Sequence, residues 1–226
     1  MSTVFQFLAK GGPVMIPIVG LSIATVASAL ERAIFWSRLL RAEKRIVHDV
    51  LEAAHYNLDT AAEIAFKAQD QPIGRFLFSA LRLQDPTPET FRLALQTTGE
   101  EEFIEMRRGN RLLETVVAVA PLLGLLGTVT GLIVTFVNLK IGGGGSSVDT
   151  SKAAEGIGEA LITTAGGMIV AIVALLILRV STTFQGKQVE YFSKVAGKLE
   201  LIYRHLWYER SQIPEESRSQ FANREF

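Results

Sequence analysis

The feature that most constrains this sequence is a charge-free apolar run of 25 residues, from Thr115 to Leu139. A helix of about 20 apolar residues, rising about 1.5 Å per residue, crosses the roughly 30 Å of hydrocarbon in a bilayer. Small and hydroxyl residues recur in this run at spacings of three or four, so they align on one helical face: Ala120, Gly124, Thr128, Gly131 and Thr135. Because lipid supplies no hydrophobic force between helices, such a face favours close helix packing. The run therefore predicts a membrane helix that packs against neighbouring spans.

Two further apolar stretches bracket this run, Gly11 to Leu30 and Ala160 to Leu178. The first contains Ala27-Ser28-Ala29, which imitates a signal-peptide cleavage site, but its apolar core is long and a cationic cluster follows it instead of preceding it. We therefore expect a retained first span. The predicted fold class is an all-α integral membrane protein with three transmembrane helices and helical cytoplasmic extensions.

Cationic residues are distributed unevenly, although the formal net charge is +0. Of the 23 Lys and Arg residues, 12 lie between Arg32 and Arg111 and 8 lie after Leu178. Cytoplasmic segments are enriched in Lys and Arg, so we expect the N-terminus outside and the C-terminus in the cytoplasm. The predicted segments are an external N-terminus (1–11), transmembrane helix 1 (12–36), a helical cytoplasmic domain (37–114), transmembrane helix 2 (115–139), an external loop (140–152), transmembrane helix 3 (153–179) and a cytoplasmic helical tail (180–226).

The segment between the first two spans has a composition and a residue spacing that favour helices separated by turns. Thr60 to Gln69 and Pro88 to Glu105 carry apolar residues at helical spacing, and the GEEEF stretch from Gly99 to Phe103 is interpreted as a solvated face. Because Gly109 is the sole helix breaker before the second span, we expect one long helix to run from the cytoplasm into the membrane. The tail from Val180 to Tyr208 is also expected to be helical.

Several classes of function are disfavoured by what the sequence lacks. It contains no cysteine, which excludes disulfides and thiolate metal sites. His48 and His55 could share a helix face, but no further ligand lies near them in the sequence, so we expect no metal site. Nucleotide-binding and hydrolase motifs do not occur, and we expect no enzyme activity, no cofactor and no nucleic-acid partner. A solute transporter is disfavoured because three spans in 226 residues lack inverted repeats.

Glu159 is the single residue that most strongly suggests a functional site, because it immediately precedes the third apolar stretch. Ionisable side chains in a spanning helix are costly and usually face a bundle interior or water, so they mark candidate ion pathways. If Arg179 marks the cytoplasmic edge, the 20 residues up to it span about 30 Å, which puts Glu159 near the outer edge. The alternative is an interfacial carboxylate in the first turns of a helix, where the helix dipole favours negative charge.

Hydroxyl residues accompany Glu159 in the third span. Thr163 lies one turn beyond Glu159 on the same face, and Thr164 is adjacent. In an antiparallel pair, Thr128 would lie at a similar depth, and two facing stripes would line a polar pore. The alternative is that each hydroxyl bonds to its own backbone one turn back. The candidate ion-pathway residues are Thr128, Glu159, Thr163 and Thr164, and the candidate packing and kink residues are Pro121, Gly124, Gly127, Gly131, Gly166 and Gly167.

Two motifs in the second and third spans resemble those of the ExbB/TolQ/MotA proton-channel family, and most closely its ExbB/TolQ branch. They are APLLGLLGTVTGLI at 120–133 and GIGEALITTAGGMIVAI at 156–172, and both GGPVMIPIVGLSI in the first span and the ERAIFW that follows fit the same pattern. The resemblance implies a homopentamer around a central pore that holds two copies of a single-span ExbD- or TolR-type partner. It also implies that Thr128, Glu159 and Thr164 occupy pore-lining positions and that Pro121 kinks the second span.

A proton wire that does work needs a titratable group inside the membrane, and beyond Glu159 the spans offer only hydroxyls. The resemblance implies that the partner supplies a membrane aspartate and that ion flow moves the partner relative to the ring. The expected protein is therefore an ExbB-like subunit of an inner-membrane motor that energises a TonB-like process such as outer-membrane import. Alternatives are a TolQ-type subunit for envelope constriction, a sodium-driven stator-like motor, and a structural membrane scaffold in which every Gly and Thr serves packing. A MotA-type stator is disfavoured because such proteins have four spans.

Overall fold

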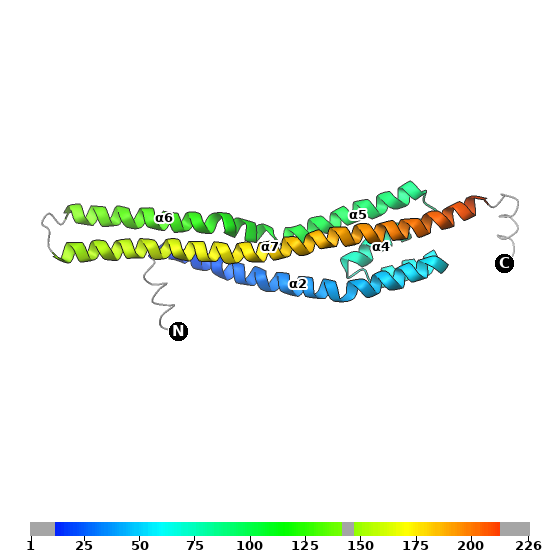
Figure 1. The fold of residues 1–226 in the computed structure, drawn as a ribbon, viewed down its shortest axis with the longest axis horizontal. Coiled ribbons are helices and arrows are strands. Elements are labelled where there is room, and N and C mark those ends of the chain that lie inside the picture. The colour runs from blue at the N-terminus through cyan, green and yellow to red at the C-terminus, as the bar shows by residue number, and fades with distance from the viewer. Residues whose placement is uncertain (1–11, 142–146, 213–226) are drawn as a thin grey trace. The chain divides into compact units, whose positions relative to one another are not determined.

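The computed structural model describes residues 12–141 and 147–212 of the chain, with side chains described for 12–137 and 153–209. Every regular element within these residues is an α-helix, which confirms the predicted all-α fold class. In chain order the helices are α2 (Met15–Tyr56), α3 (Leu58–Lys67), α4 (Pro72–Leu81), α5 (Pro88–Arg108), α6 (Arg111–Ile141) and α7 (Ser147–Gln212) (Figure 1).

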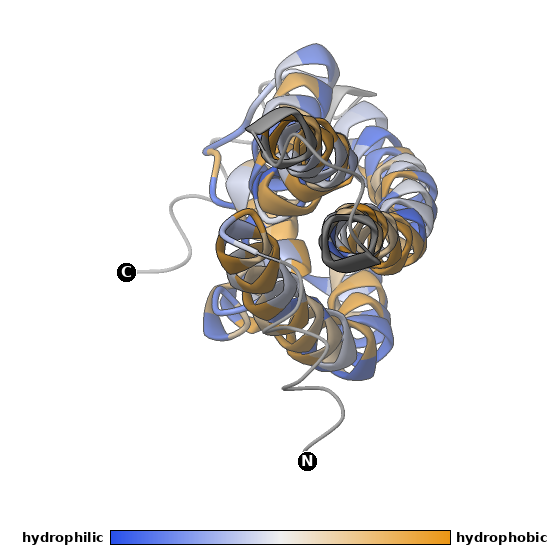
Figure 2. Ribbon diagram, turned by 90° about the vertical axis from the view of Figure 1, so that its left-hand side faces the viewer, coloured by the Kyte–Doolittle hydropathy of each residue, from blue (hydrophilic) through white to orange (hydrophobic). Residues whose placement is uncertain are grey.

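Three helical stretches are long and apolar enough to cross a membrane, as the sequence predicted: Met15–Tyr56, Pro88–Val137 and Ala153–Glu209. In each of them, only 22% of the most apolar window is buried. Figure 2 shows apolar residues on the outward faces of helices as well as on the faces that meet. A protein that exposes this much apolar surface along its helices needs lipid or other subunits around them. The chain is a multi-pass membrane protein.

The chain divides into two compact units, and α2 and α7 contribute residues to both. The membrane unit consists of Met1–Ile34 and Arg107–Thr183 and holds the three apolar spans. The extramembrane unit consists of Phe35–Met106 and Phe184–Phe226. Each unit has its own buried apolar core.

In the membrane unit, α6 and the first part of α7 lie side by side and antiparallel (Figure 1). Their apolar contact contains five buried residues, Leu113, Val116, Ala120, Ala171 and Ala174. Helix α6 continues through Pro121 without interruption, although proline removes one backbone hydrogen bond from a helix interior. The first part of α2 runs parallel to α7, and its first turn lies beside the middle of the α6–α7 pair (Figure 1).

The expectation of one long helix through Gly109 is wrong, because α5 ends at Arg108 and α6 begins at Arg111. A Cβ atom at Gly109 would overlap the guanidinium of Arg32 in α2, so only glycine leaves room for this buried arginine. The break also places Asn110 where its side chain accepts a hydrogen bond from Ser181 of α7 at 2.7 Å. Tertiary contacts therefore fix the break at a residue that weakens helices.

In the extramembrane unit, α3, α4 and α5 pack with parts of α2 and α7 around an aromatic core. Phe91 and Tyr203 stack with ring centres 4.1 Å apart, and the ring centres of Phe76 and Phe192 are 4.7 Å apart. Helix α3 is capped by Asn57, whose side chain accepts hydrogen bonds from two backbone amides of its first turn. The predicted stretches Thr60 to Gln69 and Pro88 to Glu105 correspond to α3 and α5, whereas α4 was not singled out from the sequence.

The interpretation of the GEEEF stretch as a solvated face is wrong for two of its residues. Gly99 is buried, and Glu102 is 8% exposed. Both carboxylate oxygens of Glu102 accept hydrogen bonds of 2.6 Å from the Arg75 guanidinium of α4. Glu100 and Glu101 are exposed, as expected.

Candidate ion-pathway site

Glu159 lies deep within its helix and not at its start. Helix α7 begins at Ser147, so twelve residues and about 18 Å of helix precede the acid. The favourable interaction of a carboxylate with the helix dipole is confined to about the first turn. The alternative that Glu159 lies in the first turns of its helix, where the helix dipole would favour its charge, is therefore wrong.

One neighbour of Glu159 comes from the turn just before α2. A Cβ atom at Gly12, just before α2, would overlap Oε1 of Glu159, so the carboxylate lies directly against this glycine. The Glu159 side chain is half-buried.

Along the axis of α6, Glu159 lies at the level of Gly131, because Ala160, the residue after Glu159, contacts Gly131. The apolar run of α6 continues for eight residues, about 12 Å, beyond Gly131 to Leu139. Glu159 is thus level with the beginning of the first span but well inside the apolar length of the second.

The small residues of α6 and α7 face one another within the chain. A Cβ atom at Gly131 would lie 2.8 Å from Cβ of Ala160, and one at Gly127 would overlap the hydroxyl of Thr163. The expectation that the hydroxyls of the two spans lie at similar depth agrees with this register, because Thr128 follows Gly127 directly. The close approach uses glycine and alanine, as membrane helix packing requires.

The two candidate threonines of α7, Thr163 and Thr164, form different hydrogen bonds. Thr163 is 1% exposed, and its hydroxyl donates a hydrogen bond of 2.7 Å to the carbonyl of Ala160 in its own helix. The Thr164 hydroxyl instead crosses to α6 and donates a hydrogen bond of 2.7 Å to the carbonyl of Gly124. Each hydroxyl oxygen keeps lone pairs that can accept a further hydrogen bond. The self-bonding alternative therefore holds for Thr163 and not for Thr164.

Thr128 does not lie in the contact between α6 and α7. It is half-buried, and its hydroxyl donates a hydrogen bond of 2.7 Å to the carbonyl of Leu125 in its own helix. The expected stripe included Thr128, but Gly127 takes that place against α7. Thr128 therefore lies at the flank of the α6–α7 contact, near the depth of Thr163.

The predicted packing glycines divide between two neighbours. Gly124, Gly127, Gly131 and Gly167 are in the α6–α7 contact, whereas Gly166 contacts the first span. The distance from the Cβ position of Gly166 to Cε of Met15 is 3.2 Å. Gly166 is thus a packing residue, as predicted, with α2 as its partner.

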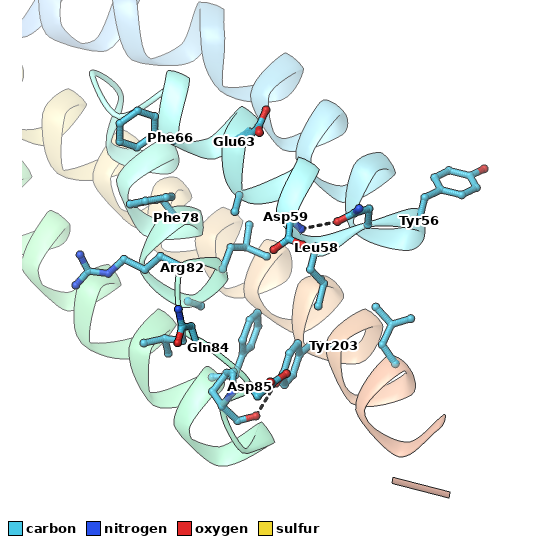
Figure 3. A pocket seen from close by; sticks show the side chains of 18 of the residues that line it. Tyr56, Leu58, Asp59, Glu63, Phe66, Phe78, Arg82, Gln84, Asp85 and Tyr203 are labelled. Carbon is cyan, nitrogen blue, oxygen red and sulfur yellow. Dashed lines mark hydrogen bonds between the residues drawn. The ribbon is translucent and has the colours of Figure 1, made fainter. Parts of the chain in front are cut away.

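Outside the spans, a hollow of about 970 Å³ lies in the extramembrane unit (Figure 3). It is formed by α3, α4, the segment before α5, and α7. Figure 3 shows Asp59 and Glu63 along one side, with the Arg82 side chain directed away from them. Among the residues whose side chains are described, no group of three or more His, Asp or Glu side chains could hold a metal ion.

Sequence reasoning missed three polar contacts that depend on the tertiary fold. They are the contact of Gly12 with Glu159, the buried pair of Glu43 with Gln188, and the buried pair of Asn110 with Ser181. The partners in each pair are 71 or more residues apart, so no local pattern links them. Gly12, beside Pro13, was the residue whose local sequence could have indicated a tight turn.

The fold and this site define a class of protein: a helical membrane protein whose second and third spans pack through small and hydroxyl residues beside a half-buried acid. A family model described as the MotA/TolQ/ExbB proton channel family matches residues 68–194. The chain belongs to this family, as the motifs in its spans indicated.

Three relatives illustrate the similarity. The chain is 59% identical over 207 residues to ExbB-like protein 1 of Synechocystis sp., an alignment that covers 92% of this chain and 81% of that protein. It is 37% identical over 194 residues to ExbB-like protein 3 of the same organism, covering 86% of this chain and 92% of that protein. It is 27% identical over 193 residues to the biopolymer transport protein ExbB of Salmonella typhimurium, covering 78% of this chain and 77% of that protein.

Proposed function

We propose that this chain is the ring-forming, ion-conducting subunit of a proton-driven motor in the cell inner membrane. The observation that carries the proposal is the position of Glu159: a half-buried acid, twelve residues inside α7, at the level of Gly131 within the second span. An ionisable group within a membrane span is energetically costly. Such groups are therefore rare, and they usually mark a pathway for ions. The orientation that goes with this function has the N-terminus outside and the C-terminus in the cytoplasm, because Lys and Arg concentrate in the extramembrane segments.

The proposed pathway contains Thr128, Glu159, Thr163 and Thr164. Glu159 exchanges the ion, and the hydroxyl oxygens of the threonines accept hydrogen bonds from it along the way. The hydroxyl hydrogens of Thr128, Thr163 and Thr164 are engaged by carbonyl oxygens at 2.7 Å, which leaves their lone pairs directed elsewhere. Protons are favoured over sodium because, among the pathway residues of this chain, Glu159 is the one carboxylate and the others offer only hydroxyl oxygens.

We further propose a homopentamer that encloses an ExbD- or TolR-type single-span partner with a membrane aspartate. The small-residue stripes cannot supply the contacts between subunits, since α6 and α7 use them within one chain. The outward apolar residues of the same helices are available instead, among them Leu125, Val129 and Leu161. Ion flow between the aspartate and Glu159 would move the partner against the ring and energise a TonB-like process such as outer-membrane import, or a Tol-like envelope process.

The test combines function and assembly in one set of variants. Glu159→Ala, Glu159→Gln, Thr128→Val and Thr164→Val are each expected to abolish energy-dependent function while the pentamer, counted by native mass spectrometry, stays assembled. Glu155→Gln, which changes an exposed acid one turn earlier in α7, is the matched control and should keep function. Full activity in all four variants would contradict the proposal and support a membrane scaffold. Loss of the pentamer would reassign these residues to packing.

A further inference from the structure

Glu159 presses its carboxylate against the backbone of Gly12, and this contact leaves no space for a side chain at position 12. A Cβ atom built there would overlap Oε1 of Glu159 and lie 3.1 Å from the carboxylate carbon and 3.7 Å from Cγ. Gly12 also has a φ of 64°, in the left-handed region that other residues rarely adopt. Space and backbone conformation both require glycine at this position.

The turn that contains Gly12 is held in place by the start of α2. The carbonyl of Gly12 accepts a hydrogen bond from the amide of Met15 at 3.1 Å, and the carbonyl of Pro13 accepts one from Ile16 at 3.3 Å. Met15 and Ile18 are 5% and 2% exposed. Both side chains contact α7 at Gly166, about two turns beyond Glu159, so the turn is anchored on the same helix that carries the acid.

We propose that Gly12 is a positioning residue for Glu159: the turn before the first span is the wall against which the acid of the third span is held. The inference rests on the proposed function, since it assigns to Gly12 the task of fixing where the carboxylate stands in the ion pathway. The positive end of the α2 helix dipole lies on the same side, which favours a negative charge at this point. Sites that exchange ions need their groups held within about half an ångström.

A methyl group at position 12 would meet the flexible end of Glu159 and not the backbone of a neighbouring helix. Gly12→Ala is therefore expected to displace the carboxylate and to strain the turn, because alanine disfavours a φ of 64°, while leaving the helix packing intact. Gly20 is the matched control in the same span, because a Cβ atom built there meets nothing within 4 Å. Gly20→Ala should leave the acid where it is.

The contact itself is tested by cysteine cross-linking, for which the cysteine-free chain is a clean background. Full-length Gly12→Cys/Glu159→Cys in liposomes should form an intramolecular disulfide on oxidation and run as a monomer. Gly20→Cys/Glu159→Cys should not. A cross-linked dimer, or the same absence of a disulfide at 12 and 159 as at 20 and 159, would overturn the contact.

The positioning role is tested by infrared spectroscopy together with proton flux. The carboxyl band of Glu159 is identified by its loss in Glu159→Gln. Gly12→Ala should shift this band and lower proton flux about ten- to a hundredfold, whereas Gly20→Ala should do neither. An unshifted band with wild-type flux in Gly12→Ala would overturn the proposal. Wild-type flux in Glu159→Gln would instead contradict the proposed function, and the cross-link at 12 and 159 would still form.

Discussion

Ser181 of α7 donates a hydrogen bond of 2.7 Å to the side-chain oxygen of Asn110, the residue at the break between α5 and α6. The two residues are 1% and 2% exposed and 71 positions apart in the chain. The bond ties the start of the second span to the end of the third. A buried pair of this kind stabilises chiefly because losing one partner leaves the other without a hydrogen bond.

Ser181→Ala is accordingly expected to lower the free energy of unfolding by about 1–3 kcal/mol, since Asn110 would keep a buried, unpaired oxygen. The measurement is thermal or denaturant unfolding of the full chain in detergent. Thr182→Ala is the matched control, because the exposed Thr182 hydroxyl bonds only to the carbonyl of Arg179 in its own helix. Equal stability of the two variants would show that the Ser181 bond contributes nothing.

The ion pair of the partly exposed Arg75 with the buried Glu102 gives a second prediction. Glu102→Gln should destabilise the extramembrane unit by about 1–3 kcal/mol, because the variant loses a charge-assisted, two-pronged hydrogen bond. The half-exposed Arg75 keeps this figure below that of a fully buried pair. Glu101→Gln, next to it but exposed, should change the unfolding free energy by less than about 0.5 kcal/mol. A stabilised Glu102→Gln protein would contradict this account.

Glu43 predicts a pH dependence of stability. Its side chain is 5% exposed and accepts a hydrogen bond of 3.0 Å from Gln188. Burial raises the pKa of the Glu43 carboxyl above its ordinary value of 4.5, against the opposing effects of the Gln188 hydrogen bond and the Lys44 charge. Tyr191 also faces this carboxyl, and burial together with the Glu43 charge raises the pKa of the tyrosine. Folding therefore favours the protonated acid.

The direction in which folding stability changes with pH follows from proton linkage. Because the folded chain retains the Glu43 proton to higher pH than the unfolded chain, this contribution is complete below about pH 4.5 and is lost as pH rises through the raised pKa. The melting temperature of wild type relative to Glu43→Gln should fall as pH increases above 4.5. Glu190→Gln, an exposed acid on α7, should run parallel to wild type. A constant difference between wild type and Glu43→Gln would contradict the raised pKa.

The proposed orientation predicts which engineered cysteines react with impermeant maleimide in intact cells. A cysteine at Ser146, in the connection between α6 and α7, should react from outside. The inside position should be Tyr56, which is 87% exposed, and it should react only after the membrane is opened. The reverse pattern of labelling would contradict the orientation.

The sequence predicted those features of the fold that depend on local chemistry. The length of the run from Thr115 to Leu139 indicates a span because bilayer thickness sets the number of residues needed. The helical composition after Val180 correctly predicted that α7 continues beyond its span. Similarly, glycine at 127 and 131 indicated helix packing, since close approach in lipid needs small residues.

The remaining features depend on partners that are distant in the sequence. The small-residue stripes on α6 and α7 indicated helix packing. They did not indicate that the two stripes would pack against each other within one chain. The sequence showed that Gly109 weakens the helix. The break there also depends on Arg32, whose guanidinium lies against the Gly109 backbone. Glu102 was taken as solvated because Arg75, its partner, lies 27 residues earlier. Glu159 was identified from its chemistry, whereas the contact with Gly12 required the tertiary arrangement of the first span.

The most direct test of the central proposal, that Glu159 exchanges the ion, is proton flux through the purified complex. The full chain, isolated with the single-span protein that co-purifies with it, is reconstituted in liposomes containing a pH-sensitive dye, and a pH gradient is applied. Glu159→Gln should reduce proton flux to the level of empty liposomes, while Glu155→Gln, one turn earlier on α7, should conduct like wild type. Wild-type flux in Glu159→Gln, with the complex intact, would contradict the assignment of Glu159 to the ion pathway.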